Sequence, residues 1–281
     1  MHIEYKNNIY LRYVYLIVAI GRADRFSPNS VEKDAAILES VCNELTGKGC
    51  DVVLIDEENL DGNIDGQIFL SMGRLPSTLN LLNEKNEVGC IVINDACSVV
   101  LCCNRRKLNE MLKQAEIPLA PEKGDYGYWL KRADGVAENS GDVQYAADEA
   151  EAVEKEKQMR EAGVGDVLVC AHVPGDLIKF YGVRDMDFFR YYYPGDDGKW
   201  KFSDEARNGK PQHYSFSEND LHAISDKAAA AAGLDVYGGD CIVREDGTFC
   251  IIDLNDWPSF SRCREEAAKA IAGKVCKLVS L

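Results

Sequence analysis

The sequence predicts an α/β protein of about two domains, and three features of the chain support this prediction. Its length of 281 residues exceeds that of a typical single domain. Over roughly the first hundred residues, short apolar strands alternate with helical patterns, which is typical of an open sheet covered by helices. The later part is richer in consecutive strands and contains a strand–turn–strand pattern at residues 237–260.

The first hundred residues predict one sheet and its helices. Apolar runs indicate strands at 13–20, 51–55, 67–72 and 90–93, and helical spacing indicates helices at 33–45 and 79–86. Ligands of open α/β sheets bind at the carboxyl ends of the strands. The residues that we therefore expect around one edge of a cleft are Arg22, Arg25, Gly73, Arg74 and Asn94.

A second region begins after a predicted helix at 107–115. A small α+β lid is indicated by strands at 126–130, 144–145 and 166–171 and by a strongly charged helix at 148–161. The antiparallel section that follows has strands at 177–183 and 186–193, a helix at 221–232, the strand–turn–strand pattern and a last helix at 264–272. The charged helix of the lid is a solvated face to which we assign no chemistry.

The strand–turn–strand pattern carries the strongest chemical signal. Asp246-Gly247 between two apolar runs predicts a hairpin with a two-residue turn, which places Asp240 directly opposite Asp253. Asn255 shares a face with Asp253 because side chains alternate along a strand. Opposed carboxylates repel each other, and together with an amide oxygen they offer the hard ligands that Mg²⁺ prefers. A three-residue loop would shift the register by one residue and remove this argument.

Composition limits the partners. A net charge of −15 disfavours nucleic acid and anionic membranes as main ligands, but it leaves room for a local basic cleft. The apolar run at 13–20 is too short to cross a bilayer and lacks the layout of a signal peptide. The 11 cysteines lack zinc-binding spacing, and we expect them to be reduced thiols of a cytoplasmic protein.

The hairpin motif and the order of the elements resemble those of ATP-grasp enzymes along most of the chain. The specific motif is D-x(12)-D-x-N, formed by Asp240, Asp253 and Asn255 and followed by Trp257-Pro258. The resemblance implies an α/β ATP-grasp fold with a Rossmann-like N-terminal domain at 1–103, an ATP-grasp domain at 104–281 and a lid at about 122–171.

The same resemblance implies a nucleotide site. Asp240, Asp253 and Asn255 would bind Mg²⁺, with Mn²⁺ as an alternative ion, and Lys107 and Lys131 would bind the ATP phosphates. For Lys107, which follows Arg105 and Arg106, a simple basic helix start is the alternative. The loop at 133–141 would cover the phosphates. The hinge, whose backbone would read adenine, consists of Cys170, Ala171, His172 and Val173.

Further polar residues are candidates for catalysis or for contacts to ribose and metal. Asp176 would bind ribose or a metal, although Pro174-Gly175-Asp176 is also a plain turn. Lys179 would face the γ-phosphate or the acceptor, or else pair with an acid on the neighbouring strand. Arg190 could stabilise the transferring phosphoryl group, and Arg262, directly after the hairpin, suits an anionic substrate.

The resemblance implies an enzyme that uses ATP and Mg²⁺ on a small acidic or hydroxylated substrate. The first hypothesis is a carboxylate–amine (or thiol) ligase that acts through an acylphosphate. The alternatives are a small-molecule kinase similar to the inositol phosphate kinases and a nucleotide-binding protein without turnover. A polyphosphate acceptor would need a dense cluster of Lys and Arg, and the few basic residues available favour the ligase. Many relatives are dimers, so a homodimer is one option.

Overall fold

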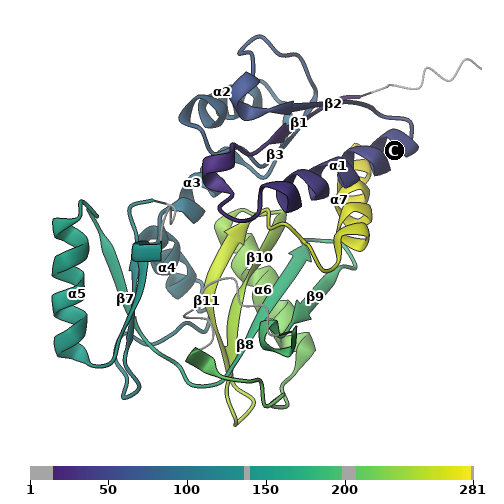
Figure 1. The fold of residues 1–281 in the computed structure, drawn as a ribbon. Coiled ribbons are helices and arrows are strands. Elements are labelled where there is room, and N and C mark those ends of the chain that lie inside the picture. Colours follow the sequence, from purple (N-terminus) through teal and green to yellow (C-terminus); the bar gives the residue numbers. More distant parts are fainter. Residues whose placement is uncertain (1–14, 136–139, 198–206, 280–281) are drawn as a thin grey trace, which may run out of the picture.

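The computed structural model describes residues 15–135, 140–197 and 207–279, which form three sheets and the helices packed on them (Figure 1). The chain begins in a parallel sheet, continues through a small antiparallel sheet and then forms the antiparallel sheet that contains the hairpin. In these described ranges, no helix is long and apolar enough to cross a membrane.

The first sheet is parallel, with the strand order β2-β1-β3-β4. Its elements are β1 Leu16–Gly21, α1 Val31–Gly47, β2 Asp51–Asp56, β3 Ile68–Ser71, α2 Pro76–Glu87 and β4 Ile91–Ile93. The inner strands β1 and β3 are almost completely buried, because helices and loops cover both faces of the sheet. This double burial explains why continuous apolar runs predict these strands correctly.

The second sheet, which we call the lid sheet, has the strand order β6-β5-β7. Its elements are β5 Tyr128–Arg132, β6 Val143–Ala146, α5 Glu149–Glu161 and β7 Val167–Ala171. One face packs on α5 through Tyr128, Leu130 and Ala146. Because side chains alternate along a strand, the other face carries Trp129 and Lys131. The predicted α+β lid is therefore present, and only one of its faces is occupied by α5.

The third sheet, which we call the central sheet, has the strand order β11-β10-β8-β9. Its strands are β8 Asp176–Val183, β9 Phe189–Tyr192, β10 Val236–Val243 and β11 Phe249–Asp256. The helices α4 Arg105–Gln114 and α6 Glu218–Ala232 cover one face. The apolar cluster between them includes Leu112, Ala228, Phe180 and Leu254. The opposite face carries the charged side chains of the candidate site.

One helix, α3 Ala96–Cys103, was not predicted. Its Asp95 cap is a clear start signal, since Asp95 Oδ1 accepts hydrogen bonds from the N–H groups of Cys97 at 2.8 Å and Ser98 at 3.3 Å. The helix itself contains valine and cysteine, which favour helices weakly, so the local pattern did not reveal it. Short 3-10 turns lie at Asp24–Phe26, Glu57–Asn59, Ser140–Asp142 and Pro194–Asp197.

The last helix, α7 Arg264–Leu278, packs beside α1, as Figure 1 shows. Leu38 and Val41 of α1 and Ile271 and Val275 of α7 belong to one buried apolar cluster. The last helix of the chain thus packs against the first helix of the parallel-sheet region. The predicted division into 1–103 and 104–281 assigns these two helices to different domains.

The hairpin keeps the predicted pairing of Asp240 with Asp253, but its turn differs from the prediction. Arg244 N–H donates to the Thr248 carbonyl at 2.8 Å, which closes a three-residue loop with Gly247 at a φ of 79°. This loop shifts the register by one residue in the neighbouring pairs. An extra residue in β11, Ile252, lies at a bulge and restores the predicted register at Asp240. The two deviations cancel, so the predicted carboxylate pair is present.

Candidate active site

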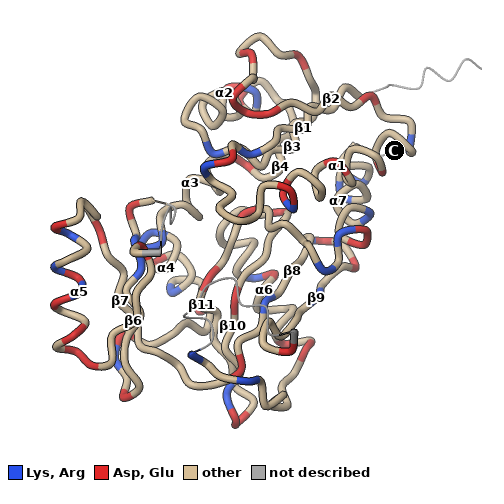
Figure 2. The backbone as a smooth tube through the Cα atoms, in the orientation of Figure 1, with Lys and Arg blue, Asp and Glu red and all other residues tan. Residues whose placement is uncertain are grey.

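A row of charged side chains crosses the central sheet. Lys179 on β8 lies directly opposite Asp240 on β10, which lies directly opposite Asp253 on β11. Opposed residues point to the same face, so these three side chains stand beside one another, and we call them the charged row. Figure 2 shows acidic positions on the neighbouring strands β10 and β11. Lys179 Nζ lies 3.1 and 3.3 Å from the two carboxylate oxygens of Asp240. The side chains of Lys179 and Asp240 are each 22% exposed and that of Asp253 is 25% exposed, so a ligand can reach them.

The residues of the predicted metal triad lie on one face. Asn255 follows Asp253 by two positions and is paired with Gly238, which precedes Asp240 by two positions. Because side chains alternate along a strand, Asn255 points to the same face as the two aspartates. Within the described part of the chain, no group of three or more His, Cys, Asp or Glu side chains is arranged as a metal centre. Mg²⁺ usually takes only one or two carboxylates and completes its shell with water and phosphate oxygens. Two carboxylates and one amide therefore fit Mg²⁺, although they would not form an all-protein cage.

Helix α4 adds a cation that the sequence analysis did not select. Arg105 Nε lies 4.0 Å from Asp253 Oδ1, and its Nη1 donates to the Arg132 carbonyl of the lid sheet at 3.1 Å. Among the described residues, the buried Nε has no hydrogen-bond partner. Lys107, which was predicted to bind phosphate, is exposed on the same helix. Asn104 caps this helix by accepting from the Lys107 N–H at 3.0 Å, and that cap was the signal that could have placed Arg105 at the cleft.

Lys131 of the lid sheet reaches the hairpin. Its Nζ donates to the Ile252 carbonyl of β11 at 2.8 Å. A small cavity lies between α4, the lid sheet and β11, and Arg105, Lys131, Leu168 and Asp253 are among its lining residues. Two of the cations that surround this cavity thus lie at the Asp253 end of the charged row.

Apolar side chains continue the same face of the central sheet beyond the charged row. Leu177 precedes Lys179 by two positions, and its partner Ile242 follows Asp240 by two. Together with Val173 and Cys250 they form a separate buried cluster. These nearly buried side chains form an apolar floor next to the charged row.

The predicted hinge begins in the last two residues of β7, Cys170 and Ala171, and continues past the end of the strand. The N–H groups of Ala171 and His172 donate to the carbonyls of Pro121 and Gly127, both at 2.8 Å. Among the described residues, no hydrogen bond to the N–H of Val173 is present. Burial raises the pKa of the Cys170 thiol, so this side chain stays protonated and neutral. The N–H groups of Ala171 and His172 are thus engaged, whereas that of Val173 has no such bond among the described residues.

The imidazole of His172 is held by two aromatic residues of the lid sheet. Trp129 Nε1 donates to His172 Nδ1 at 3.0 Å, and the Tyr145 ring meets the imidazole edge-on at 5.8 Å between ring centroids. Burial lowers the pKa of His172, which favours the neutral ring with its proton on Nε2. His172 therefore has a structural role in supporting the hinge.

Asp176 is not brought to the charged row. Its carboxylate is 2% exposed and accepts hydrogen bonds from the N–H groups of Gln212 at 2.7 Å and Tyr214 at 2.9 Å. Both oxygens are thus occupied by the segment that follows residue 207. The predicted ligand for ribose or metal anchors a loop instead.

Arg190 and Arg262 lie beyond the Lys179 end of the charged row. Arg190 is exposed on β9 and forms an ion pair with Glu266 of α7. The Arg262 guanidinium lies 5.5 Å from the ring centroid of Tyr192, which is the residue opposite Lys179. The structure therefore brings Arg262 next to the row and directs Arg190 towards α7.

A tyrosine on the same face lies close to this end of the row. Tyr181 follows Lys179 by two positions and is opposite Gly238. Burial raises the pKa of Tyr181 to about 12, with Lys179 acting in the opposite direction, so its hydroxyl remains a hydrogen-bond donor at neutral pH.

Of the three arginines expected at the edge of the cleft, Arg22 and Arg74 form buried ion pairs, whereas Arg25 is exposed and lies 4.9 Å from the ring centroid of Phe26. Arg74 Nη2 lies 2.6 Å from Asp256 Oδ1, and Arg22 Nη1 lies 3.1 Å from Asp34 Oδ2. Arg22 Nη2 also donates to the Trp257 carbonyl at 3.1 Å, so these residues tie the first sheet to the end of the hairpin. Burial alone would lower the pKa of the Arg74 guanidinium, but Asp256 raises it above its ordinary value. These groups form a structural clamp, not an open edge of the cleft.

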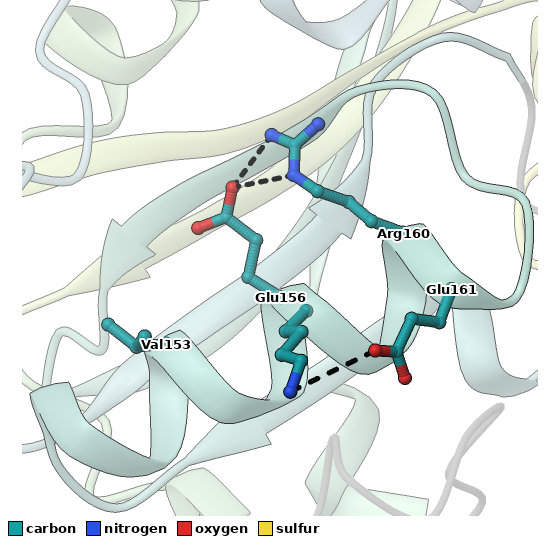
Figure 3. A pocket seen from close by; sticks show the side chains of 5 residues that line it. Val153, Glu156, Arg160 and Glu161 are labelled. Carbon is teal, nitrogen blue, oxygen red and sulfur yellow. Dashed lines mark hydrogen bonds and ion pairs between the residues drawn. The ribbon is translucent and has the colours of Figure 1, made fainter.

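Two other features do not contribute to the site. Four residues of the predicted phosphate loop, 136–139, lie outside the described residues. The hollow in Figure 3 lies on the lid helix α5, where Glu156 pairs with Arg160 at 2.7 Å and Lys157 pairs with Glu161 at 3.9 Å. These are ordinary i,i+4 pairs on a solvated helix face, as expected from the sequence.

No protein-family model and no curated protein sequence matches the chain. Solved structures match it over nearly its whole length. D-alanyl-alanine synthetase A of Vibrio cholerae superposes with a TM-score of 0.67 at 10% identity, covering 95% of this chain and 98% of that chain. The VanG D-Ala:D-Ser ligase of Enterococcus faecalis has a TM-score of 0.66 at 12% identity, with coverage of 94% and 99%.

A third similar structure is that of a RimK domain ATP-grasp protein from Sphaerobacter thermophilus. Its TM-score is 0.62 at 16% identity, with 92% of this chain and 98% of that chain covered. Identities this low establish the fold alone. The chain has the ATP-grasp fold, as its hairpin motif and order of elements predict.

Proposed function

We propose that the protein is a cytoplasmic Mg²⁺- and ATP-dependent carboxylate–amine (or thiol) ligase that acts through an acylphosphate. The observation that carries this proposal is the charged row, whose Asp253 end borders a cavity lined by Arg105 and Lys131. Two of the structures with this fold are a D-Ala:D-Ser ligase and a D-alanyl-alanine synthetase. Their reactions support ligation as the class of reaction, by analogy of fold.

ATP would bind between the lid sheet and the central sheet. The base would lie on the apolar floor near Leu177 and Ile242, with the Val173 N–H as a donor to it. Lys131 and Arg105 would bind the phosphates, and we rank Arg105 above the exposed Lys107 for this role. The division into domains at 1–103 and 104–281, with a lid at about 122–171, belongs to the same proposal.

Asp240, Asp253 and Asn255 would hold Mg²⁺ or Mn²⁺, and the ion supplies positive charge that stabilises phosphoryl transfer when it is bound. The transfer joins the γ-phosphoryl group to a carboxylate oxygen of the substrate and releases ADP. The amine or thiol then attacks the acyl carbon, and phosphate leaves. Lys179 and Arg262 would bind the anionic groups of the substrate and the phosphoryl group, because both lie at the end of the charged row away from Arg105.

The pairing of the arginines favours a ligase over a kinase that phosphorylates a polyphosphate. Such a kinase needs several cations free to bind the acceptor. Arg22 and Arg74 are instead neutralised by Asp34 and Asp256, and Arg190 pairs with Glu266. A small carboxylate needs fewer cations than a polyphosphate, and we place it near Arg262 and the Lys179–Asp240 pair. A homodimer fits the proposal, but the reaction does not require one.

Trapping with hydroxylamine tests the proposal. The wild-type protein, ATP, Mg²⁺ and a panel of small carboxylic acids are incubated with hydroxylamine, which converts an acylphosphate into a stable hydroxamate. We expect ATP-dependent hydroxamate formation with at least one acid, and none with Asp253→Ala. ADP formation with transfer to a hydroxyl, and no hydroxamate, would favour the kinase. Nucleotide binding without ADP formation for any acceptor would favour the non-catalytic alternative.

A further inference from the structure

The ammonium group of Lys179 contacts Asp240, one of the residues that would hold the metal ion. It is 3.1 Å from Oδ1 and 3.3 Å from Oδ2, so it faces both carboxylate oxygens. The two residues are direct cross-strand partners, and the sheet register therefore fixes their backbones side by side. The contact is built into the strand pairing and does not depend on a loop.

The surroundings of this pair explain why a cation is needed there. Asp240 is also opposite Asp253, and two carboxylates on adjacent strands repel each other when no cation lies between or beside them. Arg105 lies 4.0 Å from Asp253, and Lys179 lies 3.1 Å from Asp240. The lysine side chain carries its charge on a flexible four-carbon stem, so the ammonium group can move without any change in the sheet.

We propose that Lys179 is an internal counter-ion that competes with the metal for Asp240, a proposal that rests on the metal site of the proposed function. In the metal-free protein the ammonium group neutralises Asp240. When the divalent ion binds, it displaces the ammonium group from the carboxylate. The released group then turns towards the neighbouring end of the row, where Tyr192 and Arg262 lie and where we place the anionic substrate.

This exchange makes the placement of the Lys179 ammonium group depend on the metal. Before the metal arrives, the lysine is occupied and the substrate end of the row has one cation fewer. After the metal arrives, a positive charge becomes available beside the reacting groups. Metal binding and substrate binding are thereby coupled with a positive sign.

A titration of the full-length protein with Mn²⁺ alone tests the proposal. Electron paramagnetic resonance measures the free Mn²⁺ at each step. Lys179→Met removes the competing charge, and we expect its Kd for Mn²⁺ to be about two- to fivefold lower than that of the wild type, the factor expected from a partly exposed ion pair. Lys179→Arg retains the charge and should bind Mn²⁺ as the wild type does. Lys179→Gln provides a second neutral variant if Lys179→Met does not fold.

Lys131→Met is the matched control. It removes one positive charge at the other end of the row, but Lys131 donates to the Ile252 carbonyl and not to a carboxylate. Its effect on the Kd for Mn²⁺ should be smaller. Equal tightening in Lys131→Met and Lys179→Met would show a general electrostatic effect and overturn the proposal, as would unchanged or weaker binding in Lys179→Met.

The two proposals can fail separately. The same titration is repeated with a non-hydrolysable ATP analogue present. If the wild type binds no Mn²⁺ in either condition, the metal site is wrong and both proposals fall. If the wild type binds Mn²⁺ with the analogue and the neutral variants bind no more tightly, only the role of Lys179 is refuted.

Discussion

Asp253 and Asp256 stand three residues apart on β11, on opposite faces of the central sheet, and their substitution separates the candidate site from the structural clamp. The side chain of Asp256 is 2% exposed and accepts from Arg74 Nη2 at 2.6 Å and from Arg74 Nε at 3.4 Å. Arg22 Nη2 lies 3.8 Å from Asp256 Oδ2. Asp253 is 25% exposed, and its nearest cation, Arg105, is 4.0 Å away.

The expected losses of stability follow from this difference. Asp256→Ala leaves the buried guanidinium group of Arg74 without its carboxylate, while Arg22 keeps Asp34. Breaking a buried pair costs about 3–5 kcal/mol. With a change of about 2–4 °C in Tm for each kcal/mol, this corresponds to a decrease of roughly 6 °C or more. Asp253→Ala removes a long, partly exposed ion pair worth at most ~1 kcal/mol. It also relieves the repulsion with Asp240, so its Tm should stay near that of the wild type.

Urea denaturation followed by circular dichroism measures the free energy of unfolding of the wild type and both variants. Titration with Mg²⁺ and an ATP analogue at a temperature where each variant is folded then measures binding. We expect Asp256→Ala to lose stability and retain the nucleotide site, and Asp253→Ala to show the reverse. If Asp253→Ala loses as much stability as Asp256→Ala, the distinction between site and clamp is wrong.

Three further outcomes are expected. Arg105→Met should weaken binding of the ATP analogue roughly tenfold or more, as expected for the loss of a charged hydrogen bond to phosphate. Lys107→Met, at an exposed position, should leave the Kd measured by calorimetry unchanged. The opposite result would restore the assignment of Lys107 made from the sequence. Gly247→Ala should lower the free energy of unfolding by about 1 kcal/mol or more, because φ is 79° and a Cβ would lie 2.8 Å from the Ser215 carbonyl oxygen. An unchanged midpoint of urea denaturation would contradict the three-residue loop. Burial raises the pKa of Cys250 and Cys263 from 9.0 to about 11. The unfolded chain therefore loses these protons first, and stability should fall as the pH rises from 9 to 11. Equal stability to urea at these two pH values would refute this.

The strands and the hairpin could be predicted from the sequence because their signals are local. Buried apolar runs marked β1 and β3, and Asp246-Gly247 marked the reversal of the chain. The exact turn could not be predicted, because a two-residue turn and a three-residue loop followed by a bulge give the same pairing at Asp240. The pairing at Asp240 depends on the loop length and the bulge together, and only the three-dimensional structure shows each of them.

The roles of individual charged residues depended on partners far away in the sequence. Arg22 and Arg74 follow buried strands, which is the position of ligand-binding residues in an open sheet. Their partner Asp256 is 182 residues from Arg74, so no local pattern could reveal that the pair is structural. Asp176 is similar, since the Gln212 and Tyr214 N–H groups that occupy it come from a distant segment.

The choice between Lys107 and Arg105 was a question of helix phase. The predicted helix begins at 107, and a difference of two residues in an α-helix turns a side chain to nearly the opposite face. The cap at Asn104 fixes the true phase and brings Arg105 to Asp253. The alternative stated for Lys107, a simple basic helix start, describes its exposed position in the structure.

The central claim is that the charged row forms a nucleotide site that depends on a divalent ion. The most direct measurement is isothermal titration calorimetry of the wild type and Asp253→Ala with a non-hydrolysable ATP analogue, with and without Mg²⁺. We predict binding to the wild type that requires Mg²⁺ and is lost in a folded Asp253→Ala protein. Equal binding of the analogue by both proteins, or no binding by the wild type at millimolar nucleotide, would contradict the claim.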